Sequence, residues 1–582
     1  MVQVQRNLRP QNKNASFAKT QETDAMASSL SSKLVSPVAT ARLSALELLS
    51  SVQISPNKLL RFLRRNEMGQ RLVDLLMDPD TQVASAAAEA LFGFTSSEDP
   101  HVCDFFFDKN IAQVIHSTLT SSSAPSPALI HVLAFCAAGS SKCALALSTS
   151  ELITPLIKIC ALDPVFETFH STAPAAWECL ASILIECGLN VFDFNLIFSA
   201  INSLCQSQDN YLAKSKCFVF VAHNFDLMSS SSLQSIKSDS LVSIVSSLLT
   251  PFTSFPIDLI TSSIHSLFLS TSSAQSSAKE DTYSQFESEL LKYANIIESI
   301  SSCLDAISVF FSEPCDEIPE KTEILLQLFP NIELLFNTVK SFIFPVWSFC
   351  KSLKDSEIGD LEGELGNITV NLYGLVQRST LVFSNLLLGI PTDLLNFIDP
   401  SEIFNQIFEL FVSGYTSEYS SESYHNSLLE SFSSLLALLI KLADVSINFD
   451  WLSSIISDTN FSNKSSTICI DFISIVFVFI SRSFLALNQD FLINLTSFLF
   501  RMANSTVSLV AAEALSSICS VYESCLSSPS VNSLINIDTI SNLLSSSSLL
   551  TLSRSKNIKL KANEREALNS AISMANSICK RN

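Results

Sequence analysis

The sequence predicts an all-α fold, an armadillo/HEAT-like α-solenoid in which helical hairpins stack into a superhelix. Three observations lead to this prediction. The chain has 582 residues, more than one compact core normally serves. Glycine is scarce, with 10 residues against 47% hydrophobic residues, a balance that suits long helices joined by polar turns. An apolar pattern of helical period also recurs at the spacing of armadillo and HEAT repeats, about 40 to 47 residues.

The repeat is clearest in RLVDLLMDPDTQVASAAAEALFGF, residues 71–94. A polar turn at 78–80 separates two apolar segments, and the second segment places one apolar face at i, i+3, i+4 and i+7. The same positions recur 45 residues earlier, 42 residues later and another 47 residues after that. The shared register consists of four alanines and four leucines: Ala41, Leu46, Ala86, Leu91, Ala128, Leu133, Ala175 and Leu180.

This register has a physical reason. A small side chain lets two helix backbones approach to about 8 Å where neighbouring repeats cross, and the leucine beside it fills the groove. We therefore expect the eight residues to form the seam between repeats. Partner helices with apolar pairs at i, i+4, such as Leu72 and Leu76, precede the second, third and fourth copies, so that each unit is predicted to be a helical hairpin. Pro127 and Pro174 are expected in the first helical turn, where proline is tolerated.

The same unit returns near the far end, in STVSLVAAEALSSICSVY at 505–522. Between about 225 and 500 the pattern stays helical while the repeat blurs. The sequence thus predicts a disordered basic tail at 1–25, armadillo-like repeats at 26–272, an acidic junction of loops and a helix at 273–325, and HEAT-like repeats with a C-terminal capping helix at 326–582.

The charge of the chain indicates a class of partner. Lys and Arg total 35 against 56 Asp and Glu, a formal net charge of −21, which repels nucleic acid and attracts basic protein surfaces. A plain acidic surface without a particular partner is equally compatible with this charge. Two acidic loops supply candidate contacts for a basic cargo or simply face solvent: Glu313, Asp316, Glu317, Glu320, Asp355, Glu357, Asp360 and Glu362.

Motifs of enzymes and metal sites are missing from the sequence. It contains no P-loop, GxGxxG, GxSxG or HExxH, its 7 His residues are scattered, and its 15 Cys residues form no CxxC. We expect no catalytic residue, metal or cofactor, and we expect the cysteines to be buried as small apolar residues in a reducing compartment.

The mean hydropathy of +0.34 raises the question of a membrane. The best apolar run, FISIVFVFI at 472–480, falls short of the roughly 20 residues that a membrane span needs. We expect a buried helix there and no membrane insertion, and a membrane-associated helical protein stays as a minor alternative.

The first 25 residues carry basic side chains without an acid before Glu22. Arg6, Arg9 and Lys13 are the candidate import signal in this tail. The alternative interpretation is an ordinary disordered terminus.

From LVSPVATARLSALELLSSV to KNIAQVI the order of features resembles the symportin family, also called HEAT repeat-containing protein 3. Four features carry the resemblance. The first repeat contains the residue pairs Ser-Pro and Ala-Arg, and the following turn begins with two leucines and an aspartate. An alanine-rich second helix comes next, and then an element that introduces the next unit. The resemblance covers residues 30–190 and, more loosely, 505–580. The introducing element comprises Glu98, Cys103, Asp104, Lys109, Asn110 and Ile111.

The resemblance implies armadillo repeats followed by HEAT repeats. It also implies a transport adaptor and chaperone that holds the two ribosomal proteins that bind 5S ribosomal RNA and carries them into the nucleus through an importin of the transportin type, for large-subunit assembly. Such a protein would shuttle between cytoplasm and nucleus, and we expect a monomer. Here the tail has Pro10 without the Pro-Tyr pair of the family's signal, and the family's long acidic loop is reduced to short patches at 280–289, 312–323 and 354–364.

A generic armadillo/HEAT scaffold or trafficking adaptor with unrelated protein partners is the alternative function. It would use the same fold and the same acidic surface.

The seam yields the first testable prediction. Replacing Ala86 or Ala90 by a large residue should overpack the contact between repeats and lower the free energy of unfolding by about 1–3 kcal/mol. Urea denaturation followed by circular dichroism measures this loss. Unchanged stability in both variants would show that no tight helix contact lies here.

Overall fold

The computed structural model describes sixteen stretches of the chain and a few positions between them. Every regular element within these residues is a helix. The stretches are 28–51, 56–97, 99–121, 126–161, 172–187, 194–206, 211–223, 276–311, 331–350, 363–390, 395–415, 423–442, 464–483, 489–505, 507–524 and 562–581, and the further positions lie within 245–266, at 329 and within 452–461.

Contacts divide the chain into two compact units. Unit 1 comprises Met1–Phe255 with Glu298–Phe310, and unit 2 comprises Pro256–Ile297 with Phe311–Asn582. Helix α17, Ser276–Phe310, therefore contributes its last residues to unit 1. The fourfold division expected from the sequence stays a prediction.

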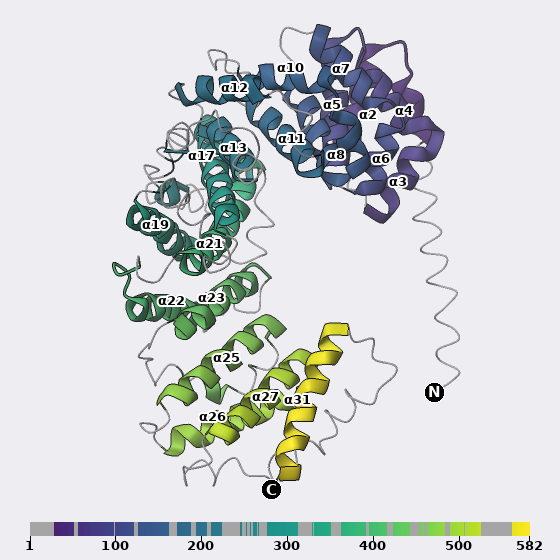
Figure 1. The fold of residues 1–582 in the computed structure, drawn as a ribbon. Helices are drawn as coiled ribbons and strands as arrows, with labels where there is room; N and C mark the ends of the chain where they lie inside the picture. The colour runs from purple at the N-terminus through teal and green to yellow at the C-terminus, as the bar shows by residue number, and fades with distance from the viewer. Residues whose placement is uncertain are drawn as a thin grey trace, which may run out of the picture. The chain divides into compact units, whose positions relative to one another are not determined.

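The helices of unit 1 form three rows, in each of which consecutive members pack together (Figure 1). We call the first the long-helix row. It contains α2 (Ala39–Ser51), α5 (Thr81–Thr95), α8 (Pro127–Gly139), α11 (Thr172–Cys187) and α13 (Tyr211–His223). The second row contains α4 (Met68–Leu75), α7 (Ile111–Ser121), α10 (Ser150–Cys160) and α12 (Phe194–Gln206). The third contains the short helices α3 (Pro56–Arg64), α6 (Pro100–Phe107) and α9 (Ser141–Leu147), and the 3-10 turn η1 (Arg65–Glu67) follows α3.

The predicted fold class, an all-α solenoid of stacked helical units, is confirmed in the described part of the chain, but in unit 1 the prediction of simple hairpins was wrong. A short helix precedes the pair in three repeats, so each of these repeats has three helices. The short helices have 7 to 9 residues, about two turns. Two turns are too few for an apolar period to stand out in the sequence.

The register residues lie on the long-helix row. The four leucines are buried, and so is Ala175, whereas Ala41, Ala86 and Ala128 are half-buried. Ala90 is buried at 1% exposure, so an overpacking substitution meets neighbours there more than at Ala86. The register also continues into α13, where Ala213 and Phe218 take the alanine and leucine positions and are both buried.

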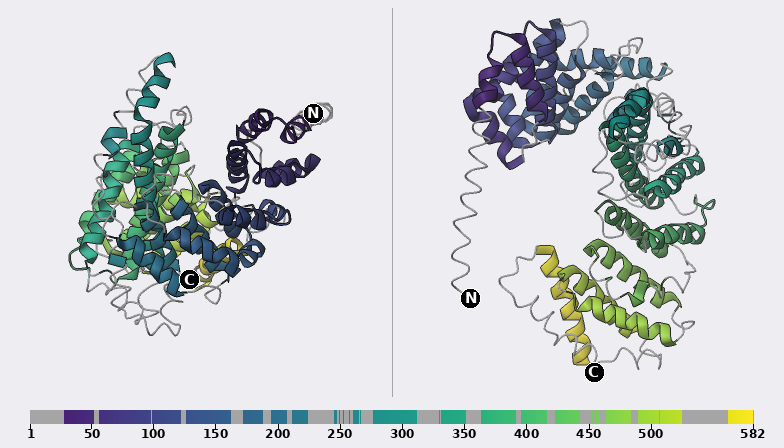
Figure 2. Two further views of the ribbon diagram at one scale, coloured as in Figure 1. Left: turned by 90° about the horizontal axis from the view of Figure 1, so that it is seen from above. Right: turned by 180° about the vertical axis from the view of Figure 1, so that it is seen from behind.

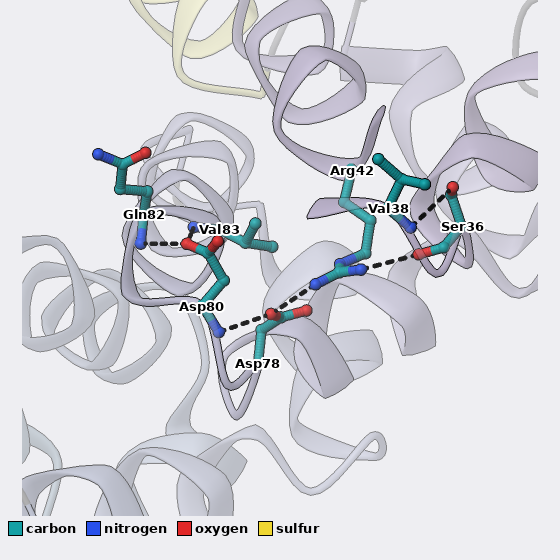
Figure 3. Close-up of polar contacts among 7 residues, drawn as sticks. All are labelled: Ser36, Val38, Arg42, Asp78, Asp80, Gln82 and Val83. Atoms are coloured by element: carbon teal, nitrogen blue, oxygen red, sulfur yellow. Dashed lines mark hydrogen bonds and ion pairs between the residues drawn. The ribbon is translucent and has the colours of Figure 1, made fainter. Parts of the chain in front are cut away.

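The turn at 78–80 is held by two carboxylates (Figure 3). Asp80 caps α5: its carboxylate accepts hydrogen bonds from the backbone N–H groups of Gln82 and Val83, at 3.0 and 3.4 Å. Asp78 accepts from the backbone N–H of Asp80 at 2.9 Å and from the guanidinium of Arg42 at 2.8 Å. Since Arg42 belongs to α2, this ion pair fastens the turn of one repeat to the long helix of the preceding repeat.

Unit 2 contains a second long-helix row, in which α21, α23, α25, α27 and α31 pack consecutively. The C-terminal helix α31, yellow in Figure 2, lies along α27. Helices α19, α22 and α26 pair with α21, α23 and α27. The bounds in this unit are α19 (Ile332–Cys350), α21 (Gly363–Gly389), α22 (Pro400–Tyr415), α23 (Ser423–Leu442), α25 (Ser466–Ser483), α26 (Gln489–Ala503), α27 (Ser508–Ser524) and α31 (Ala562–Arg581).

Aromatic rings fill the core of unit 2. Phe411 stacks on Phe408 at 6.5 Å and on Phe472 at 6.3 Å between ring centroids, and Phe461 and Phe498 meet Phe472 at 5.0 and 5.8 Å. These rings come from α22, α25 and α26 and from a short segment near 461. The apolar run at 472–480 thus begins inside the packed core, as expected for a buried helix.

Among the described residues no single helix is long and apolar enough to cross a membrane. Two short helices, Ser141–Leu147 and Glu151–Cys160, reach that length and composition together, with a bend of 84° between them.

Two glycines give a paired prediction about packing. A Cβ added at Gly414 in α22 would lie 2.7 Å from Cη2 of the buried Trp347 and 3.1 Å from Cδ2 of Leu429, whereas one added at Gly93 in α5 would meet nothing within 4 Å. Gly414→Ala should therefore destabilise the protein by about 1–3 kcal/mol. Gly93→Ala should stabilise it by about 0.5–1 kcal/mol because alanine favours the helix interior.

Differential scanning calorimetry of both variants checks the pair. Equal shifts of Tm in the same direction would contradict the packing around Trp347.

Candidate interaction surface

One position of the register faces solvent along the long-helix row of unit 1. It lies three residues after each register alanine, close to one helical turn, and all five of its side chains are polar. They are half-buried or exposed, while in the four later copies the residues immediately before and after this position are buried. Successive repeats thus align one polar side chain each: Ser44, Glu89, His131, Glu178 and Lys216.

The last members of this series form a charged cluster. The Lys216 ammonium lies 3.4 Å from Oε1 of Glu178 and 3.1 Å from Oε1 of Glu298, which comes from the part of α17 that belongs to unit 1. The side chain of Lys216 is 15% exposed, against 36% for Glu178 and 49% for Glu298. One lysine therefore neutralises one of two carboxylates, and both carboxylates stay accessible to solvent.

The surroundings of Glu178 keep its carboxylate ionised. Burial would raise the pKa of this carboxyl, but the neighbouring His131 imidazole and the charge of Lys216 outweigh burial and lower the pKa to about 2. The same contacts act on Lys216: burial would lower the pKa of its ammonium, and the charges of Glu178 and Glu298 raise it instead.

An aromatic group adjoins the charged cluster on the same row. The ring of Phe92 on α5 contacts His131 and Phe135 on α8, with centroid distances of 5.6 and 5.5 Å. His131 and Phe135 stack on each other at 6.1 Å, one turn apart on their helix. Phe92 is 37% exposed, although an aromatic ring of this size is usually covered.

His131 connects the two groups. Its Nδ1 lies 3.5 Å from Oε2 of Glu178, which is an ion pair when the imidazole is protonated. The surface therefore runs across five helices. Its aromatic rings and the imidazole lie on α5 and α8, its carboxylates on α11 and α17, and its ammonium group on α13. We call these six residues the ring-and-acid row: Phe92, Phe135, His131, Glu178, Lys216 and Glu298.

Unit 2 has polar contacts of a similar kind between its own long helices. The hydroxyls of Ser433 and Ser434 on α23 donate to Oδ2 of Asp471 on α25, at 2.9 and 2.7 Å. Ser474 donates to Glu513 on α27 at 3.4 Å, and Glu513 stands at the same register position as Glu89. Burial raises the pKa of the Asp471 carboxyl, and the two serine hydroxyls offset only part of this effect.

The structure does not describe the import-signal and cargo-contact residues predicted from the sequence. Arg6, Arg9 and Lys13 lie outside the described residues, and so do all eight acids of the two loops at 313–320 and 355–362. Sequence reasoning missed the ring-and-acid row. The signal that could have found His131, Glu178 and Lys216 is the constant offset of three from the register alanines, which singles out a polar residue in every copy.

Cysteine burial agrees with the expectation from the sequence. Among the thirteen cysteines that the structure describes, ten are buried. Burial raises the pKa of the Cys160 and Cys217 thiols, and a hydrogen bond with Cys103 together with burial raises that of Cys136. No group of three or more His, Cys, Asp or Glu side chains in the described stretches could hold a metal ion.

Comparisons with known proteins found likeness to solved structures. No family model matches the chain, and no curated protein matches it. An engineered protein solved by the Northeast Structural Genomics Consortium aligns with 95% of this chain and 99% of its own, at 13% identity and a TM-score of 0.35. A second engineered protein from that consortium aligns with 38% of this chain and 89% of its own, at 18% identity and a TM-score of 0.31. A designed armadillo repeat protein aligns with 47% of this chain and 98% of its own, at 15% identity and a TM-score of 0.31.

The charged cluster predicts a pH-dependent contribution to stability. The carboxyl of Glu178 has a pKa of about 2 in the folded chain against an ordinary 4.5, so the stability that it contributes is present above pH 4.5 and is lost as the pH falls toward 2. Glu178→Gln should therefore lower Tm clearly at pH 7 and progressively less from pH 4.5 downward.

Thermal melts of wild type and variant over this pH range test the prediction. Glu333→Gln, at an exposed position of α19, is the matched control and should change stability by no more than about 0.5 kcal/mol at any pH. A Glu178→Gln effect of the same size at pH 7 and pH 3 would contradict the contacts with His131 and Lys216.

Proposed function

We propose that this chain is a non-enzymatic adaptor that binds basic proteins on its stacked helices. The observation that carries the proposal is the ring-and-acid row, in which accessible carboxylates and rings are aligned across five helices of unit 1. Such an extended surface suits recognition of a protein chain better than a small molecule, for which sites are concave and enclosed. The net charge of −21 favours a basic partner through long-range attraction.

The cargo that we propose is the pair of ribosomal proteins that bind 5S ribosomal RNA. This choice rests on the resemblance of residues 30–190 to the symportin family, and it agrees with the charge, since proteins that bind ribosomal RNA are rich in Lys and Arg. The adaptor would hold these proteins, shield their basic surfaces and deliver them to the nucleus for large-subunit assembly. It would act as a monomer that shuttles between cytoplasm and nucleus.

An importin of the transportin type is the proposed carrier of this complex. Arg6, Arg9 and Lys13 would form the signal that it reads. Because the tail lacks the Pro-Tyr pair, the carrier is a separate proposal from the cargo and needs a separate test: the importin should bind the full chain and lose binding when the three basic residues are replaced by alanine.

Mixing the purified full chain with the two ribosomal proteins tests the cargo proposal. We expect a soluble stoichiometric complex in size-exclusion chromatography, and we expect it to weaken as salt rises because exposed charges are screened. The absence of any complex at low salt would overturn the proposal.

A pull-down from lysate then separates the proposed function from its alternative. Recovery of the ribosomal proteins together with an importin supports the import adaptor. Recovery of other proteins without either of them would identify a general helical-repeat scaffold.

A further inference from the structure

We propose that the ring-and-acid row is an arginine-binding surface, and that its occupant is an arginine-bearing segment of a basic partner protein. This inference rests on the proposed function and names its contact site: Phe92 and Phe135 offer ring faces for the guanidinium, and Glu178 offers its carboxylate.

The ring end of the surface is accessible to solvent. Phe92 remains 37% exposed even though it contacts the rings of His131 and Phe135. Its neighbours on α5, Leu91 and Phe94, are buried. A ring held by two others presents a fixed face, and fixed ring faces attract cations through their quadrupole.

The carboxylate end has acceptor capacity left. An ionised carboxylate offers about four lone-pair sites, and Lys216 donates to Oε1 of Glu178 at 3.4 Å. Oε2 faces the His131 imidazole, whose Nδ1 lies 3.5 Å away. These two contacts use only part of that acceptor capacity, and the Glu178 side chain is 36% exposed, so a further donor can reach the carboxylate without displacing Lys216.

The ring and the carboxylate are separated by one imidazole ring. His131 contacts both Phe92 and Glu178, and α8, which carries His131, packs against both α5 and α11. A group that stacks on the rings and points N–H groups toward Glu178 must be flat, cationic and rich in donors. The arginine guanidinium has these three properties, whereas the lysine ammonium is compact and strongly hydrated.

The charge balance of the surface excludes an anionic occupant. Glu178 and Glu298 face one ammonium, that of Lys216, and Glu89 adds an exposed acid on α5. The net charge of this surface is thus negative, like that of the whole chain. An arginine-bearing segment is therefore attracted both at long range and at contact.

Fluorescence anisotropy with two labelled peptides tests the inference. One is a Gly-Ser peptide with arginines at regular intervals, and the other carries lysines at the same positions. At low salt the full-length protein should bind the arginine peptide several-fold more tightly. Phe92→Leu keeps an apolar side chain but removes the ring face, and Glu178→Gln removes the charge; each should weaken the arginine peptide by about three- to tenfold.

Matched controls from unit 2 exclude general effects of charge or exposure. Phe397, 39% exposed, and the exposed Glu333 supply Phe397→Leu and Glu333→Gln, which should leave binding unchanged. Thermal melts verify that all four variants fold. Equal binding of the two peptides, no effect of Phe92→Leu, or no binding at low salt would each overturn the inference.

Because the peptide assay contains no ribosomal protein, its failure is distinguishable from failure of the proposed function. If the ribosomal proteins bind but the peptide preference is absent, the cargo is held elsewhere. If the arginine peptide binds as expected but the ribosomal proteins do not, the surface stands and its partner is another basic protein.

Discussion

The structure depends on close contact between consecutive long helices. In unit 1 the register leucines, such as Leu91 and Leu133, are buried, and the long helices that carry them pack against those of neighbouring repeats. Burying a leucine contributes about 1.5–3 kcal/mol, so each repeat is stable only beside its neighbours. This mutual dependence is what makes a repeat array fold as a stack. The small residues of the register, Ala175 and Ala213 among them, allow the helices to approach closely enough for that packing.

The same contact determines the surface. Once the seam fixes which side of every long helix faces its neighbours, the residue three positions beyond the register alanine must face solvent in each repeat. Polar residues from distant parts of the sequence are thereby aligned, and His131, Glu178 and Lys216 come within reach of one another. The ion pair of Arg42 with Asp78 supports this alignment, because it ties the turn that precedes α5 to α2, the long helix of the preceding repeat.

Strong periodicity made the long helices and their seam predictable from sequence, but weaker signals were lost. Helices α3, α6 and α9 are too short to show a period. The copy in α13 escaped because Phe218 replaces the leucine and its spacing from Ala175 differs from the others. The contact of Glu298 with Lys216 could not be foreseen, since α17 carries no copy of the register and reaches unit 1 only through the tertiary fold. The functional prediction chose the acidic loops by composition alone, whereas Glu178 and Glu298, the acids of the ring-and-acid row, lie on helices.

The buried thiols have a practical consequence. Cys103, Cys136, Cys160, Cys179 and Cys217 come from five different helices of unit 1, and each is hidden from solvent in the packed state. A thiol reacts with alkylating reagents as the thiolate and only when a reagent can reach it, so each of these residues reports the momentary opening of its own helix. These thiols therefore act as intrinsic labels. Mass spectrometry of their alkylation can record how often each repeat opens locally and in which order the helices separate.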